Sequence, residues 1–260
     1  MTDLSSSPLD RFRLDDKVVV VTGASSGLGV GFARAVAAVG ATVVLAARRE
    51  DRLESLAEEL RAGGTRVLTR RTDVAVEAEC QALAAAAAEE FGRIDVLVNN
   101  AGLGTSGTTA LREDPAAFDQ VVDVNLKGVY WMARACAPHM PQGSSIVNIA
   151  SVHGWAASRF PGAAYAASKA GVVGLTRDLA QQWAQRRGIR VNALCPGYFD
   201  SEMTSQDGDV LGAMVEQTGI LHRFGQQEEL DSALLFLASP ASSYMVGASL
   251  VVDGGLSATI

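Results

Sequence analysis

The stretch KVVVVTGASSGLG, residues 17–29, determines how this chain begins to fold. Its unbroken run of valines predicts a β-strand that is buried on both faces over residues 17–22. The Ala- and Val-rich segment at residues 28–39 predicts a helix. Between them the glycines follow the spacing G-x-x-x-G-x-G, which permits a tight turn and lets backbone N–H groups at the helix start approach a phosphate. This strand, turn and helix together predict a dinucleotide site.

The same alternation of short β-branched runs with Ala-rich or amphipathic stretches continues along the chain. The predicted strands cover residues 17–22, 42–47, 66–71, 94–99, 145–150, 189–195 and 249–252. The predicted helices cover residues 28–39, 51–61, 76–91, 115–137, 163–186 and 227–238. Because most of these strands are fully apolar, we expect helices on both faces of a seven-stranded parallel sheet, which is a doubly wound α/β Rossmann fold.

The pattern predicts a single domain over residues 15–260, since no linker or internal repeat interrupts it. Residues 1–14 mix serines and charges without an apolar core, so we interpret them as a mobile arm and not as a secretory signal. Residues 198–218 are polar, contain methionine and follow a strand end. We expect a substrate lid there, because ligands of doubly wound sheets bind at the carboxyl ends of the strands.

Composition excludes several classes of partner. A formal net charge of −7 argues against general nucleic-acid binding, and no apolar stretch reaches the roughly 18–20 residues of a membrane span. The cysteines Cys80, Cys136 and Cys195 lack C-x-x-C spacing, which fits a reducing cytoplasm. The histidines share no metal-ligand spacing, so we expect no metal.

A tyrosine and a lysine indicate the chemistry. Tyr165 and Lys169 lie four residues apart in a predicted helix, so their side chains project from one face. A free tyrosine has a pKa of about 10, too high for an efficient general base at neutral pH. A nearby ammonium group lowers such a pKa, and an oxidised nicotinamide ring would add to the effect. We therefore expect Tyr165 to exchange a proton with a carbonyl or alcohol oxygen.

Further motifs extend this pair. Residues 99–102 read NNAG after the fourth predicted strand, Ser151 ends the fifth, and Asn125 lies in the helix between them. With the glycine spacing, these motifs resemble the short-chain dehydrogenase/reductase family, in its single-domain branch of roughly 250 residues. The resemblance covers almost the whole chain and implies hydride transfer between a nicotinamide cofactor and a ketone or secondary alcohol. The catalytic residues it implies are Asn125, Ser151, Tyr165 and Lys169.

The resemblance also implies a role for each member of this set. Ser151 would hydrogen-bond the reacting oxygen, and Lys169 would hold the nicotinamide ribose hydroxyls. Asn125 would interrupt its helix and hold a water that relays protons to Lys169. From the sequence alone, Asn125 could equally be a satisfied core amide.

The cofactor is expected to be NADP(H), with NAD(H) as the alternative. Arg48 and Arg49 follow the second predicted strand, where an NAD-binding domain often has an acidic residue. An arginine there can pair with a 2′-phosphate, and Arg48 is the better candidate. The resemblance adds an adenine contact from Asp73 and a carboxamide contact from Ser201, where the family usually has threonine. The expected cofactor residues are Gly23, Ser25, Ser26, Gly27, Leu28, Gly29, Arg48, Asp73, Val74, Asn99, Ala101, Gly102, Tyr165, Lys169, Pro196, Gly197 and Ser201.

The substrate is expected to be a small to medium, largely apolar carbonyl or alcohol. Its predicted pocket consists of Ser151, Leu103, Val152, His153, Trp155 and Tyr198. One alternative is an NAD-linked dehydrogenase of a sugar, polyol or steroid alcohol. Another is a 3-oxoacyl-acyl-carrier-protein reductase, which ranks lower because such enzymes often carry arginines where Trp131 and Gln181 stand here.

Two further expectations concern the whole chain. A nucleotide-sensing scaffold that lost its chemistry is the non-enzyme alternative, and the complete catalytic set argues against it. The final run VVDGG, residues 251–255, resembles the family's C-terminal strand and turn, which commonly packs against another subunit. We therefore expect a homotetramer.

Overall fold

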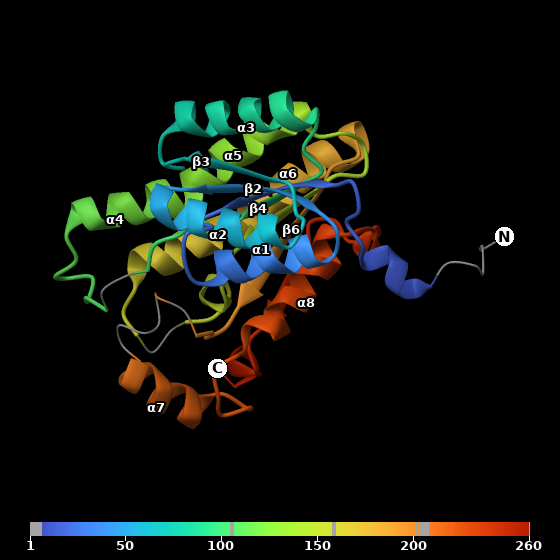
Figure 1. The fold of residues 1–260 in the computed structure, drawn as a ribbon. Coiled ribbons are helices and arrows are strands. Elements are labelled where there is room, and N and C mark those ends of the chain that lie inside the picture. The colour runs from blue at the N-terminus through green and yellow to red at the C-terminus, as the bar shows by residue number, and fades with distance from the viewer. Residues whose placement is uncertain (1–6, 105–106, 158–159, 201, 203–207, 260) are drawn as a thin grey trace.

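The computed structural model contains a seven-stranded parallel sheet in the order β3-β2-β1-β4-β5-β6-β7 (Figure 1). The structure describes residues 7–104, 107–157, 160–200, 202 and 208–259. The strands are β1 (Val18–Thr22), β2 (Thr42–Ala47), β3 (Val67–Arg71), β4 (Val96–Asn99), β5 (Ser145–Ile149), β6 (Arg190–Pro196) and β7 (Ser249–Val252). All seven predicted strands are confirmed, with ends that shift by no more than two residues.

Helices cover both faces of the sheet (Figure 1). One face carries α1 (Leu28–Ala38), α2 (Glu50–Ala62) and α8 (Gln227–Ala238). The other carries α3 (Glu77–Phe91), α5 (Gly128–Cys136) and α6 (Ala163–Arg187). Two further helices are α4 (Pro115–Val122), which packs against α6, and α7 (Gly208–Thr218). The predicted doubly wound α/β fold is confirmed.

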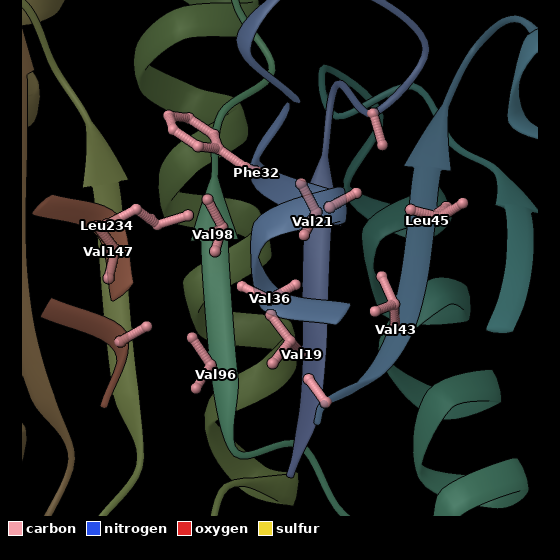
Figure 2. Packing of buried hydrophobic residues seen from close by; sticks show 14 of the residues in the cluster. Val19, Val21, Phe32, Val36, Val43, Leu45, Val96, Val98, Val147 and Leu234 are labelled. Atoms are coloured by element: carbon pink, nitrogen blue, oxygen red, sulfur yellow. The ribbon is translucent and has the colours of Figure 1, made fainter. Parts of the chain in front are cut away.

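Strand β1 shows why the sheet is interior. All of its residues are buried, and side chains alternate between the two faces. Val19 and Val21 join the cluster that contains Phe32 of α1, as Figure 2 shows. Val18 and Val20 join the cluster on the opposite face. A continuous valine run therefore supplies apolar surface to both layers of helices.

The strand order places a crevice beside β1. The chain runs outward from β1 through β2 to β3, and then continues on the other side of β1 with β4. The connections leaving β1 and β4 diverge at this point, and in doubly wound sheets ligands bind in the crevice that results. The carboxyl ends of β5 and β6 lie on the same edge of the sheet because all the strands are parallel.

One predicted helix is interrupted. Apolar periodicity predicted one helix over residues 115–137, whereas the resemblance implied an interruption at Asn125. The structure has α4, a π-helical turn (Asp123–Lys127), α5 and a 3₁₀ turn (Ala137–His139), so the helix is interrupted at Asn125. The segment expected to be a lid contains α7 in its described part. No helix in the described ranges is both long enough and apolar enough to cross a membrane.

The predicted N-terminal arm is described only from Ser7 onward. It forms a 3₁₀ helix (Pro8–Phe12), and the Arg11 guanidinium donates hydrogen bonds to the turn that follows α8. Leu14 is 1 % exposed and belongs to the core cluster under α1. The packed unit therefore begins before residue 15. Residues 1–6 lie outside the described residues, and the mobility of the arm stays a prediction.

Candidate active site

Helix α6 brings Tyr165 and Lys169 together, as their spacing predicts. The Lys169 Nζ lies 5.6 Å from the centre of the Tyr165 ring. The lysine is buried, and its ammonium donates a 2.8 Å hydrogen bond to the carbonyl of Ile149 at the end of β5. This bond fixes the lysine between α6 and the carboxyl edge of the sheet.

Burial changes the acidity of both groups. It lowers the pKa of Lys169 to about 8, because a dry environment disfavours the ammonium ion. It raises the pKa of Tyr165, although a hydrogen bond with Ser151 acts in the opposite direction. In the chain alone, desolvation is the largest effect on the phenol, so the pKa of Tyr165 lies above its usual value and not below it as expected.

Ser151 lies directly after β5 and faces Tyr165. Its hydroxyl hydrogen-bonds to the Tyr165 side chain and also accepts the backbone N–H of His153 at 3.2 Å. The latter bond caps the 3₁₀ turn Val152–Gly154. Ser151 is therefore held by its own turn in an orientation that reaches the phenol.

Asn125 lies in the π-helical turn between α4 and α5 and is fully buried. Its amide oxygen accepts the Leu103 N–H at 2.7 Å, and its amide nitrogen donates to the Leu103 carbonyl at 2.9 Å and to the Ser168 hydroxyl at 3.2 Å. A Cβ at Gly102 would lie 3.3 Å from the Asn125 oxygen and 3.6 Å from the Lys169 Nζ. The structure thus brings Asn125, Lys169 and the loop after β4 to one place.

The predicted substrate residues divide into two groups. His153 and Tyr198 meet beside the phenol: the Tyr198 hydroxyl is 3.1 Å from His153 Nε2, and the His153 ring is 6.0 Å edge-on from the Tyr165 ring. Burial lowers the pKa of His153, so its imidazole is neutral at pH 7. By contrast, Val152 is 1 % exposed in the core and Trp155 is 54 % exposed at the surface.

The glycine-rich turn after β1 is closely packed. A Cβ at Gly29 would lie only 2.3 Å from the Gly23 carbonyl oxygen, so the start of α1 approaches the turn as only glycine allows. The Thr22 hydroxyl accepts the backbone N–H groups of Asn100 at 3.0 Å and Ala101 at 3.1 Å. These bonds join the carboxyl ends of β1 and β4 at the crevice.

The remaining predicted cofactor residues occupy neighbouring positions. Asn99 is a buried brace whose amide donates to Asn148 on β5 at 2.9 Å. Asp73 accepts the Ala75 N–H at 3.0 Å in the turn after β3. Gly197 lies so close to the C-terminal turn that a Cβ would be 2.7 Å from the Asp253 Cα. Ser201 lies outside the described residues.

Three charged residues gather at the dinucleotide end: Arg49, which the sequence ranked below Arg48, and Arg52 and Glu202, which it did not indicate. Arg49, and not Arg48, donates to the Ser25 hydroxyl at 3.2 Å, while Arg48 is exposed. Arg49 and Arg52 both pair with Glu202, at 3.0 Å and 3.2 Å. The doubled arginine after β2 was the available signal for Arg49, whereas nothing in the sequence pointed to Glu202.

These groups fit an anionic dinucleotide. Serine hydroxyls in the turn after β1 and guanidinium groups after β2 are suitable donors for phosphate. The Lys169 ammonium has three donors, one of which is used by the Ile149 carbonyl. The described residues contain no group of His, Cys, Asp and Glu that could hold a metal ion.

Comparisons with known proteins agree with this geometry. A family model described as enoyl-(acyl carrier protein) reductase matches residues 23–257. A galactitol 2-dehydrogenase (L-tagatose-forming) of Cereibacter sphaeroides is 42% identical over 250 residues, which cover 94% of this chain and 96% of that protein.

Two solved structures superpose closely on the fold. A short-chain type dehydrogenase/reductase from Mycobacterium marinum has a TM-score of 0.92 and 37% identity, covering 96% of this chain and 99% of that chain. A gluconate 5-dehydrogenase from Burkholderia cenocepacia J2315, in complex with NADP and tartrate, has a TM-score of 0.92 and 37% identity, covering 98% of this chain and 100% of that chain.

Proposed function

The chain belongs to the short-chain dehydrogenase/reductase family, and from this premise we propose that it transfers a hydride between NADP(H) and a ketone or secondary alcohol. One observation carries the proposal: Ser151, Tyr165 and Lys169 converge at the carboxyl edge of the sheet, beside the crevice where doubly wound folds bind nucleotides. In this proposal the three side chains, with Asn125, form the catalytic set.

Tyr165 is the general acid. Its raised pKa keeps the phenol protonated at neutral pH, so the hydroxyl can donate its proton to a carbonyl oxygen as that oxygen gains negative charge. Ser151 hydrogen-bonds the same oxygen and stabilises the developing alkoxide. The nicotinamide cofactor, when bound, would supply the hydride for reduction or accept it in oxidation.

Lys169 and Asn125 support this step. The Lys169 ammonium would hold the nicotinamide ribose hydroxyls, and its positive charge would stabilise the phenolate that remains after proton transfer. Asn125 fixes the loop at Leu103 and contacts Ser168, the residue before Lys169, so it positions the lysine. A water that relays protons between Asn125 and Lys169 is part of the proposal.

The basic residues after β2 support NADP(H) over NAD(H). Ala47 ends the strand where an NAD-binding domain often has an acid, and Arg48 and Arg49 follow it. An arginine pairs with a 2′-phosphate through two parallel hydrogen bonds, which NAD(H) cannot offer. The gluconate 5-dehydrogenase that superposes on this chain was solved with NADP.

A polyol or sugar-derived alcohol is a second candidate substrate. His153 and Tyr198 present a neutral imidazole and a hydroxyl beside Tyr165, and these polar groups suit a substrate with several hydroxyls better than a purely apolar ketone. The galactitol 2-dehydrogenase relative supports this class. An acyl-carrier-protein substrate is less supported, because Trp131 stands where such reductases often carry an arginine.

The proposal includes a homotetramer in the cytoplasm. Exposed apolar side chains at the C-terminal end of the chain, Tyr244, Val246 and Val251, favour contact with another subunit. The cysteines Cys80, Cys136 and Cys195 are free and buried, which suits a reducing compartment.

Turnover of a panel of ketones and polyols with NADPH and NADH tests the proposal. We expect NADPH to be used more efficiently, and Tyr165→Phe to lower kcat by about 10²- to 10⁴-fold with the Kd for NADPH unchanged. Tyr130→Phe, at an exposed tyrosine on α5, is the matched control and should be fully active. Equal use of NADH would overturn the cofactor assignment, and an active Tyr165→Phe variant would overturn the mechanism.

A further inference from the structure

A carboxylate occupies the basic end of the crevice. Glu202 lies in the segment after β6, yet its two carboxylate oxygens accept hydrogen bonds from the two terminal nitrogens of Arg49, at 3.2 Å and 3.0 Å. The Arg52 guanidinium adds a contact at 3.2 Å, and the Ser26 hydroxyl also hydrogen-bonds to Glu202. Residues 153 positions apart in the chain thus form one ion-pair cluster.

This carboxylate is held in its ionised form. Hydrogen bonds from Arg49, Ser26 and Arg52 lower the pKa of Glu202 to about 2. At neutral pH the cluster is therefore an anion surrounded by two cations and a hydroxyl.

The donors around Glu202 are those that a phosphate monoester requires. Arginine binds carboxylate and phosphate through the same fork of N–H groups. Ser25, which accepts a hydrogen bond from Arg49, and Ser26 belong to the glycine-rich turn that approaches the nucleotide. A guanidinium that donates both terminal nitrogens to Glu202 has fewer donors left for a phosphate, and two anions at one site repel each other.

We propose that Glu202 is an internal anion that a 2′-phosphate must displace from Arg49, so that Glu202 reduces the margin by which this chain prefers NADP(H) over NAD(H). The inference rests on the proposed cofactor site, and it makes Glu202 a specificity-determining residue for the cofactor. A nucleotide without a 2′-phosphate does not compete for these donors, so its affinity does not depend on Glu202.

Binding of nucleotide fragments to the full-length protein tests this. The probes are 2′,5′-ADP, which carries the 2′-phosphate, and 5′-AMP, which lacks it, measured by calorimetry at low and high salt. We expect Glu202→Gln to tighten 2′,5′-ADP binding by about threefold to tenfold and to leave 5′-AMP binding unchanged. The gain should shrink at high salt, because exposed ion pairs are screened.

Glu50→Gln is the matched control, since it removes one exposed negative charge next to Arg49 at a residue outside the cluster. It should change the ratio of the two affinities much less than Glu202→Gln does. Because Glu202 is exposed, both variants should unfold at the temperature of the wild type.

Three outcomes overturn the inference. Weaker binding of both probes to Glu202→Gln means that the carboxylate holds the bound nucleotide instead of competing with it. No change with either probe means that Glu202 has no role at the site, and an equal gain in Glu50→Gln means a general charge effect. If neither the wild type nor Glu202→Gln prefers 2′,5′-ADP, the NADP(H) assignment fails as well. This outcome distinguishes failure of the cofactor assignment from failure of the role of Glu202 alone.

Discussion

Burial acts in opposite directions on the two ionisable groups at the centre of the site. It lowers the pKa of Lys169 to about 8 and raises the pKa of Tyr165, because each uncharged form is favoured in a dry environment. At pH 7 Lys169 is therefore an ammonium ion that binds its proton more weakly than a free lysine does. Tyr165 is a phenol that keeps its proton. This is the protonation state from which a carbonyl is reduced.

The buried Lys169 should support turnover but lower the free energy of unfolding. The pKa of Lys169 is about 8 in the folded protein, whereas the reference value for an unfolded chain is 10.5. Below pH 8 both states carry the proton, but the folded state binds it less tightly. The resulting loss of stability is greatest below pH 8 and disappears as pH rises to about 10.5. Lys169→Met removes this penalty but also removes the partner of the Ile149 carbonyl. Its stability relative to the wild type should therefore be about 2–3 kcal/mol greater at pH 7 than at pH 10, and turnover should be abolished.

Urea unfolding at pH 7 and pH 10 measures this effect. The stability of Lys169→Met relative to the wild type should be greater at pH 7 than at pH 10. A difference that does not vary with pH would attribute the effect to packing of the methionine and not to the buried charge.

The sequence predicted the placement of Tyr165 and Lys169 better than their acidity. Spacing alone placed Tyr165 and Lys169 on one helix face, because helical geometry is local. The direction of the Tyr165 pKa depends on how far the tertiary structure excludes water, which spacing does not contain. The preference for Arg48 over Arg49 had the same weakness, because only the fold determines which of the two contacts Ser25, and that residue is Arg49.

At the scale of elements, the π-helical turn is explained by its hydrogen bonds. Asn125 satisfies both the N–H and the carbonyl of Leu103, and an amide can do this only if its side chain points out of the helix toward the loop after β4. The extra residue in the turn gives it that direction. Without the extra residue, the Asn125 side chain would point elsewhere, and the N–H and carbonyl of Leu103 would lose their partners.

Asn125→Ala should consequently lower the free energy of unfolding by about 2–4 kcal/mol, since two backbone groups lose their partners. Ser168→Ala removes only the third bond of Asn125 and should cost about 1 kcal/mol. Chemical denaturation compares the two variants, and amide hydrogen exchange at Leu103 reports the local loss. If Asn125→Ala is as stable as Ser168→Ala, the amide does not hold this loop.

The strands were predictable because a strand covered on both faces is apolar along its whole length, so the ends of the apolar run indicate the ends of the strand. Periodicity alone predicted an unbroken helix over residues 115–137, because apolar residues continue through the π-helical turn, and only the family resemblance implied the interruption at Asn125. Its interruption depends on the bonds to Leu103, which lies 22 residues away and belongs to another element. Helix α7 was missed because its residues read as a polar segment after a strand.

At the scale of the whole molecule, the buried cysteines predict how the fold responds to alkali. Burial raises the pKa of Cys80 to about 12 and also raises the pKa of Cys136 and Cys195, from a reference value of 9.0. Above pH 9 the unfolded chain loses these protons while the folded chain keeps them, so stability falls as pH rises. The Cys80 thiol, with a pKa of about 12, contributes up to about 1.4 kcal/mol per pH unit in this range.

Cys136→Ala isolates one of these contributions from the opposing effect of Lys169. Under reducing conditions the wild type should lose stability relative to this variant as pH rises from 9 to 11, and urea unfolding at several pH values measures the difference. Parallel stability curves for the two proteins would show that the thiol titrates alike in the folded and unfolded chains.

The two edge strands of the sheet are protected to different degrees against pairing with a strand of another chain. β3 carries the exposed side chains of Arg70 and Arg71 at one rim, whereas β7 carries Val251, which is 39 % exposed, at the other. Charges deter a second chain from adding to a rim, and an uncharged rim lacks this deterrent. A continuous sheet across many copies needs two receptive rims on each chain, so an edge of this kind favours the pairing of two copies over an open stack of strands.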